Sequence, residues 1–114
     1  MRCDRLYLLD ITEVADAIGG FLTGIDRDVF MGSDLVRSTI LQKLIVIGEA
    51  AARLTEGFRT LHPEVDWRDI ANFRNIAMHA YFSVDWRIVW VAATKDAPDL
   101  REIVRALYER EYPE

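Results

Sequence analysis

Residues 74–81 hold the side chains of this 114-residue sequence that are best suited to phosphate chemistry. Arg74 stands five residues before His79, and Tyr81 follows His79 by two. An arginine guanidinium is a planar, permanently charged donor that matches phosphate oxygens, and a histidine gains or loses a proton near neutral pH. The combination of Arg74 with His79 therefore predicts cleavage of a phosphodiester without a metal.

The spacing of this pair poses a geometric problem. In a straight α-helix, five residues correspond to about 140° around the axis at roughly 100° per residue, so Arg74 and His79 do not share a face. Asn75 and His79 are four residues apart and do share one. Two arrangements would reunite Arg74 with His79: the helix ends just before His79, or a second copy of the chain contributes half of the site.

His62 is the other histidine of the chain, and it precedes Pro63 at an expected helix end. A histidine near a helix end is more often a structural residue than a catalyst, which favours a structural role for His62 and is also the plain alternative for His79. The sequence has one cysteine, Cys3, and the two histidines do not stand at ligand spacing. We therefore expect no metal site and no cofactor.

The charge of the chain limits how it can contact nucleic acid. Nineteen acidic against fourteen basic residues give a net charge of -5, which is the wrong sign for nonspecific coating of nucleic acid. Any RNA contact must be local. A positive patch could be formed by the arginines around the motif, although arginines interspersed with acids often form only a solvated face: Arg53, Arg59, Arg68, Arg74 and Arg87.

Length and hydropathy predict one domain over residues 1–114, since single cores typically span about 100 to 150 residues. The longest strongly apolar stretch, Leu44 to Ile47, is far shorter than the roughly 20 residues that span a bilayer. Acidic residues interrupt the N-terminus, which therefore lacks the apolar core of a secretion signal. We expect a cytoplasmic protein with no membrane partner.

Apolar periodicity predicts two long amphipathic helices in the first half of the chain. The first stripe runs from Tyr7 to Ile25; Gly19-Gly20 inside it allows a kink or an early end, but the continuous stripe favours a continuous helix. A connector over residues 24–33 follows, in which Asp26 to Met31 could form a single helical turn. Ser33 or Asp34 caps a second helix whose stripe runs to Leu61. Beside this stripe lies a second set of apolar and small residues, which suits either a central bundle helix or a dimer seam: Leu41, Ile45, Gly48 and Ala52.

The second half predicts three further helical segments. Asp66 caps the helix that carries the motif, and Ser83 caps the next one. Asp96-Ala97-Pro98 breaks that helix and opens a last amphipathic helix through Leu100 and Tyr108. No segment shows strand alternation of comparable length. The predicted fold is all-α, an antiparallel bundle of four long helices, or of five if Pro98 fully breaks the last.

The complete spacing from Arg74 to Tyr81 reproduces the R-x4-H-x-Y element of the HEPN superfamily, and the chain resembles a HepT-like toxin. Other segments resemble the family in the same order: Ile47-Gly48-Glu49-Ala50-Ala51, His62-Pro63-Glu64, Trp67-Arg68-Asp69-Ile70-Ala71, Tyr81-Phe82-Ser83-Val84-Asp85, Ile88-Val89-Trp90 and Asp96-Ala97-Pro98-Asp99-Leu100. Asn72 and Phe73 depart from the family, which commonly has glycine and an aliphatic residue there.

This resemblance implies a HEPN-like endoribonuclease toxin that dimerises through helix faces, with the two copies of the motif facing each other. It assigns His79 as general acid or base and Arg74 as the stabiliser of phosphate charge, with Asn75 and Tyr81 supporting them or holding RNA. It also implies a nucleotidyltransferase antitoxin that can transfer AMP to Tyr81. The alternatives are a noncatalytic HEPN-type module for nucleotide binding or dimerisation, and a plain structural bundle.

Overall fold

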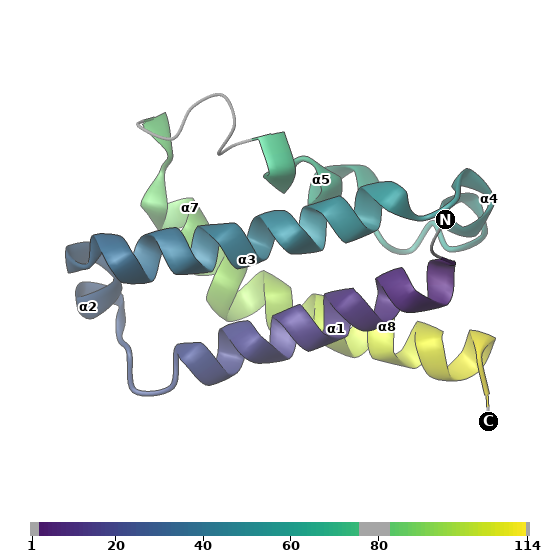
Figure 1. Ribbon diagram of the computed structural model, residues 1–114, viewed down its shortest axis with the longest axis horizontal. Coiled ribbons are helices and arrows are strands. Elements are labelled where there is room, and N and C mark those ends of the chain that lie inside the picture. Colours follow the sequence, from purple (N-terminus) through teal and green to yellow (C-terminus); the bar gives the residue numbers. More distant parts are fainter. Residues whose placement is uncertain (1–2, 76–82, 114) are drawn as a thin grey trace.

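The computed structural model describes residues 3–75 and 83–113, and these residues form helices connected by short turns. No strand occurs among them, which confirms the all-α expectation. Figure 1 shows the helices in chain order: α1 (Asp4–Phe21), α2 (Arg27–Gly32), α3 (Asp34–Arg53), α4 (Glu56–Leu61), α5 (Trp67–Ala71), α7 (Trp86–Val91), the π-helical turn η2 (Ala92–Asp96) and α8 (Ala97–Glu111).

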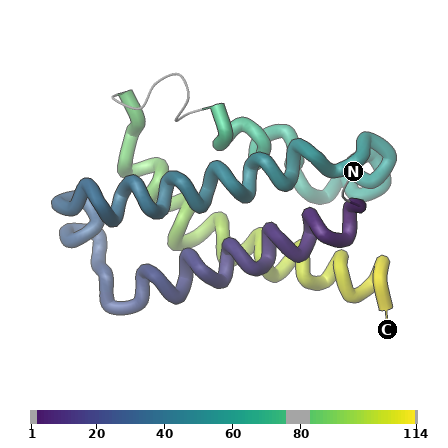
Figure 2. The backbone as a smooth tube through the Cα atoms, viewed as in Figure 1, coloured from purple at the N-terminus to yellow at the C-terminus, as the bar shows by residue number. Residues whose placement is uncertain are grey.

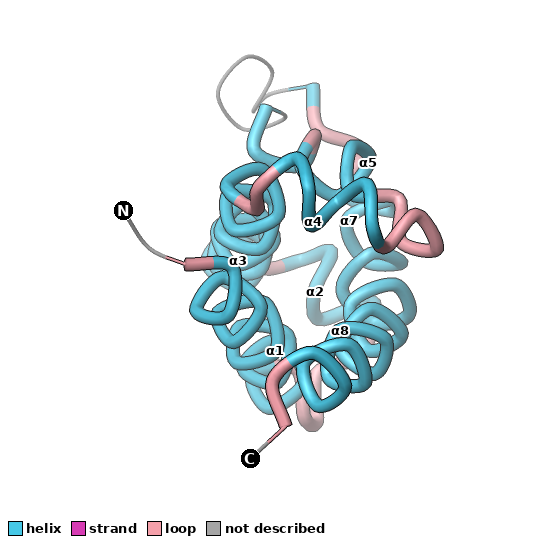
Figure 3. The backbone as a smooth tube through the Cα atoms, turned by 90° about the vertical axis from the view of Figure 1, so that its right-hand side faces the viewer, coloured by secondary structure: helices cyan, strands magenta, loops and turns pink. Residues whose placement is uncertain are grey.

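The bundle is built around α1, which packs against α3 on one side and α8 on the other. Figures 1 and 3 show α1 and α3 side by side and antiparallel, with α8 running back along α1. Fully buried side chains from these three helices form the core, among them Leu8, Ile11, Ile18, Ile40 and Val104. The shorter α5 packs on α3, which places the segment before the motif against the longest helix of the bundle.

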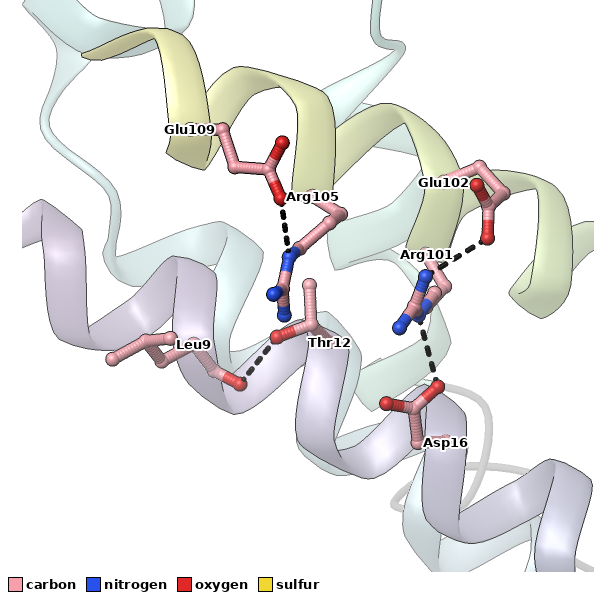
Figure 4. A network of polar contacts seen from close by, with 7 residues as sticks. All are labelled: Leu9, Thr12, Asp16, Arg101, Glu102, Arg105 and Glu109. Carbon is pink, nitrogen blue, oxygen red and sulfur yellow. Dashed lines mark hydrogen bonds and ion pairs between the residues drawn. The ribbon is translucent and has the colours of Figure 1, made fainter. Parts of the chain in front are cut away.

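Polar contacts add to the apolar packing of α1 against α8 (Figure 4). Arg101 of α8 donates a hydrogen bond from Nε to Asp16 Oδ1 of α1 at 2.9 Å, and its Nη1 donates to Glu102 Oε1 at 2.9 Å. Within α1, the Thr12 hydroxyl donates to the Leu9 carbonyl at 2.9 Å, which satisfies the polar atom of a buried residue. The Arg101 contact with Asp16 therefore joins α8 to α1 at the surface, beside their buried apolar contact.

The first helix ends earlier than its apolar stripe predicts. We expected continuation to Ile25, but α1 ends at Phe21, directly after Gly19-Gly20, and Gly24 takes a φ of 77°. Glycine favours such a left-handed turn and weakens a helix by about 1 kcal/mol relative to alanine. The connector then holds α2, which is capped by Asp26 and lies within one residue of the helical turn expected over Asp26 to Met31.

The helix expected from residue 33 to Leu61 is two helices, and the prediction of one continuous helix was wrong. The N-cap of α3 is Ser33, but Leu54 leaves helical geometry with a ψ of 144°, and Thr55 caps α4. The Thr55 amide and hydroxyl donate to the Asp4 carboxylate at 2.8 and 2.7 Å, so α1 supplies the partner that interrupts the helix. Leu54 and Phe58 are buried, as the stripe predicts, whereas Leu61 is 68% exposed.

The helix caps in the second half of the chain agree only in part with the caps predicted from the sequence. Asp66 caps α5 as predicted, accepting a hydrogen bond from the Asp69 amide at 3.0 Å. The cap of α7 is Asp85 rather than Ser83. Pro98 does not break the last helix, because the widened turn η2 directly before it keeps the backbone helical from α7 into α8 (Figure 2).

None of the helices in the described part of the chain is both long enough and apolar enough to cross a membrane.

Candidate active site

Gly48 allows the segment that precedes the motif to lie directly on α3. A Cβ atom added at Gly48 would lie 2.9 Å from the Ile70 carbonyl oxygen, 3.1 Å from the Arg74 amide nitrogen and 3.3 Å from the Ala71 carbonyl oxygen. Real Cβ atoms essentially never approach backbone oxygen so closely. Gly48 therefore allows the two backbones to come this close. The small residues on α3 were expected to serve either packing within the bundle or a dimer seam, and at Gly48 packing within one chain is the explanation.

Glu49, the next residue of α3, holds the arginine of the motif. Its Oε1 lies 3.8 Å from Nη1 of Arg74, and its Oε2 lies 3.4 Å from Nε of Arg53. One carboxylate thus bridges two guanidinium groups, one on α3 and one just beyond α5. Gly48 lets the backbone at Arg74 lie close to α3, and Glu49 forms an ion pair with the Arg74 side chain.

This ion pair orients Arg74 without making it unavailable. The side chains of Arg74 and Glu49 are 42% and 41% exposed, and pairs of this kind contribute about 0–1 kcal/mol. An arginine and a phosphate can form two parallel, charge-assisted hydrogen bonds, which are stronger than a single contact at 3.8 Å. A phosphate that approaches Arg74 can therefore displace Glu49 as its partner.

The helix that carries the motif is interrupted before Arg74. It ends at Ala71, Asn72 forms a turn, and residues 73–75 are helical again. The Asn75 amide donates to the Asn72 carbonyl at 3.0 Å, and Asn75 is exposed. The structure thus brings Arg74 and Asn75 to the surface beside α3. His79 and Tyr81 lie outside the described residues, so their separation from Arg74 stays a prediction.

The five arginines considered as a positive patch fall into separate environments. Arg53 and Arg74 meet at Glu49, whereas Arg87 hydrogen-bonds Asp85 at 3.1 Å and, mainly through that side-chain bond, lowers the pKa of the Asp85 carboxyl. Arg59 and Arg68 line a different depression, together with Glu56. Within the described part of the chain, Arg53 and Arg74 therefore share one carboxylate and Arg59 and Arg68 share one depression, so the five arginines do not form a single patch.

His62 has the structural role expected of it. Its side chain is 5% exposed, its ring lies 4.6 Å from the Phe58 ring, and its carbonyl accepts a hydrogen bond from the Trp67 indole at 3.0 Å. The two ring nitrogens lie 3.5 Å from Glu64 and 3.4 Å from Glu111. His62 therefore connects the turn before α5 to the end of α8.

Comparison with known families identifies the chain. The sequence profile of the family described as "Ribonuclease HepT-like" matches residues 11–107, which is most of the chain. The chain belongs to this family. The "Probable ribonuclease HepT" of Thermococcus cleftensis is 35% identical over 100 residues, covering 88% of this chain and 91% of that protein. A protein of Methanocaldococcus jannaschii named as an RNase is 31% identical over 100 residues, covering 88% and 92%.

Another relative, from Caldanaerobacter subterraneus and also named as an RNase, is 31% identical over 111 residues and covers 97% of this chain and 99% of that protein. No solved structure gives a significant match. Membership in the HepT-like family supports nuclease activity at the level of the family, with RNA as the substrate class.

Sequence reasoning did not identify Glu49 as part of this HepT-like site. The signal was present, because Glu49 stands in the Ile47–Ala51 segment that resembles the family. An acidic residue next to a helical glycine is nevertheless an ordinary surface residue by its sequence alone. Its role follows only from the approach of α5 to Gly48, which places Arg74 within reach.

Proposed function

We propose that residues 1–114 form one HEPN domain that acts in the cytoplasm as a metal-independent endoribonuclease toxin. The observation that carries this proposal is the half-exposed Arg74, oriented by Glu49 and standing at the first position of an R-x4-H-x-Y motif in a HepT-like chain. Its active unit is a homodimer that joins helix faces and brings the two copies of Arg74 and His79 to one cleft.

In the proposed reaction, His79 accepts the proton of a ribose 2'-hydroxyl, or donates one to the leaving oxygen, a role typically worth about 10²–10⁴ in rate. The 2'-oxygen forms a bond to phosphorus as the bond to the 5'-oxygen breaks. Arg74 stabilises the charge that develops on the phosphate oxygens. The products are a 2',3'-cyclic phosphate and a 5'-hydroxyl, and Asn75 and Tyr81 hold the phosphate or the imidazole.

A homodimer accounts for two features of the chain. A continuous helix would separate Arg74 from His79 by about 140°, so one chain does not readily present both to the same phosphate. The net charge of -5 disfavours RNA over most of the surface, and pairing two arginine sites in one cleft would concentrate positive charge where RNA must bind.

The class of reaction is tested with purified protein, a mixture of tRNA and mRNA, and a metal chelator. We expect RNA cleavage to persist in the chelator and to leave cyclic phosphate ends, because the nucleophile belongs to the substrate. A DNA oligomer of matched sequence lacks the 2'-hydroxyl and should stay intact. Equal degradation of RNA and DNA, or a requirement for added metal, would contradict this mechanism.

A nucleotidyltransferase antitoxin is the proposed partner, and Tyr81 is the proposed site of its action. The phenolic oxygen would bond to the α-phosphorus of ATP, with loss of pyrophosphate and of the phenol proton. The AMP group would place negative charge near Arg74 and compete with RNA for it.

Coexpression with such an antitoxin should therefore add the mass of AMP to the wild-type chain and silence its nuclease activity. The Tyr81→Phe variant should stay unmodified, whereas a Tyr108→Phe control should still be modified. Silencing of wild-type protein that carries no AMP would indicate steric blocking instead.

A further inference from the structure

An open groove with a volume of about 230 Å³ lies between α3, α5 and the junction of η2 with α8. Among the residues that the structure describes, those that line it are apolar or acidic, and none of them is basic. Its apolar floor reaches the surface at Ile70, Phe73 and Leu100, which are partly buried, and at Ile103, which is 42% exposed. The apolar surface is therefore accessible to a partner.

In the described part of the chain, five exposed carboxylates surround this floor: Glu64, Asp66, Asp69, Asp96 and Asp99. Glu64 lies 3.7 Å from Arg110, and Asp66 caps α5. The side chains of Asp69, Asp96 and Asp99 take part in no ion pair between residues that the structure describes. Three negative charges beside exposed apolar surface thus lack a cationic partner within the described chain.

The shape and charge of the groove restrict what it can bind. Small-molecule pockets typically measure about 300–1,000 Å³ and bury most of the ligand, whereas this groove is smaller and open. The carboxylates repel RNA phosphates. A second copy of the chain would bring the same net charge of -5 to an already acidic surface. Complementarity instead favours apolar side chains flanked by lysine or arginine.

We propose that this groove binds a cationic amphipathic segment of a partner protein. One or two large apolar side chains of the segment fill the floor between Ile70 and Ile103, and flanking lysine or arginine side chains pair with Asp69, Asp96 and Asp99. Such an arrangement follows the usual anatomy of a protein interface, in which an apolar centre is surrounded by a polar rim. Phe73 lines the groove, but its neighbour Arg74 and Glu49 do not, so this proposal does not depend on nuclease activity.

The probe is a fluorescein-labelled helical peptide that carries leucines along one face and lysines at the remaining positions. We expect fluorescence anisotropy to show saturable binding to the full chain that weakens as salt is added. Amide resonances of Ile70, Leu100 and Ile103 should shift in nuclear magnetic resonance spectra. A peptide with glutamate in place of every lysine should not bind.

A matched pair of triple variants locates the binding site. Asp69→Asn, Asp96→Asn and Asp99→Asn together should weaken binding by about tenfold, as expected for three modest charge pairs. The control, Glu13→Gln, Asp28→Asn and Glu109→Gln, removes the same charge from exposed positions outside the groove and should bind as wild type.

Equal weakening in the two triple variants would overturn the proposal, because it would show attraction to net charge alone. No binding of the lysine peptide to the wild-type chain, or shifts confined to other residues, would overturn it as well. Light scattering measures the oligomeric state of the two triple variants. A change of oligomeric state in the groove variant but not in the control would assign the groove to a second copy of the chain and contradict a separate partner.

Discussion

Replacement of Arg74 by alanine should lower the rate of RNA cleavage by about 10²–10³, the usual effect of removing one preorganised group that stabilises transition-state charge. The fold should survive, because the Arg74 side chain is half exposed and its pairing with Glu49 contributes about 0–1 kcal/mol. Gel assays of a defined RNA measure the rate, and urea unfolding measures the stability of the same preparation.

Arg105 provides the matched control for this variant. Its side chain is 51% exposed and also pairs with a glutamate, Glu109, at 2.9 Å, but it lies on α8. Arg105→Ala removes the same charge and should leave cleavage close to wild type. If Arg74→Ala and Arg105→Ala reduce the rate equally, the effect comes from general attraction of RNA rather than from the motif.

A mixing experiment then tests whether the site is shared between two chains. Arg74→Ala and His79→Ala should each be inactive alone. In a mixed dimer, Arg74 of one chain and His79 of the other remain intact in one of the two composite sites, so mixing the inactive variants should restore part of the activity. If each chain instead holds a complete site, mixing restores nothing although both variants fold and dimerise.

Apolar periodicity predicted which residues are buried better than it predicted where helices end. Leu54 and Phe58 lie on the predicted stripe and are buried, yet the chain leaves helical geometry between them. The cause is a tertiary contact, since Thr55 donates two hydrogen bonds to Asp4, 51 residues away. A local pattern contains no information about such a partner.

Pro98 illustrates the opposite error. A proline inside a helical pattern normally marks an end, because it lacks an amide donor and its ring clashes with the preceding turn. Here the preceding turn is widened into η2, and the helix continues. The choice between a break and a widened turn depends on packing, and Ala92, Ala93 and Ala97 of this region are all buried.

The sequence proposes the residues of the candidate site, but the contacts of Arg74 could not be predicted from it. Motif spacing alone singled out Arg74, Asn75, His79 and Tyr81. The ion pair between Glu49 and Arg74 joins two segments that are 25 residues apart in the sequence and that come this close because Gly48 has no side chain. Long-range contact of this kind requires the fold.

Even a methyl group added at Gly48 of α3 should therefore lower the stability of the protein. Gly48→Ala places a Cβ 2.9 Å from the Ile70 carbonyl oxygen, and overpacking of this kind typically costs about 1–3 kcal/mol. We expect a lower free energy of unfolding in urea and slower RNA cleavage, because the displaced atoms include the Arg74 amide nitrogen at 3.1 Å.

Gly19→Ala on α1 gives the matched comparison, since a Cβ there meets nothing within 4 Å. Alanine favours a helix over glycine by about 0.5–1 kcal/mol, so this variant should gain stability and cleave RNA at the wild-type rate. The same substitution is thus expected to raise the free energy of unfolding at Gly19 and to lower it at Gly48. If both variants gain stability equally, α5 does not approach α3 as closely as the contacts at Gly48 require. A Gly48→Ala protein that loses stability but cleaves normally would show instead that the close approach supports the fold without positioning Arg74.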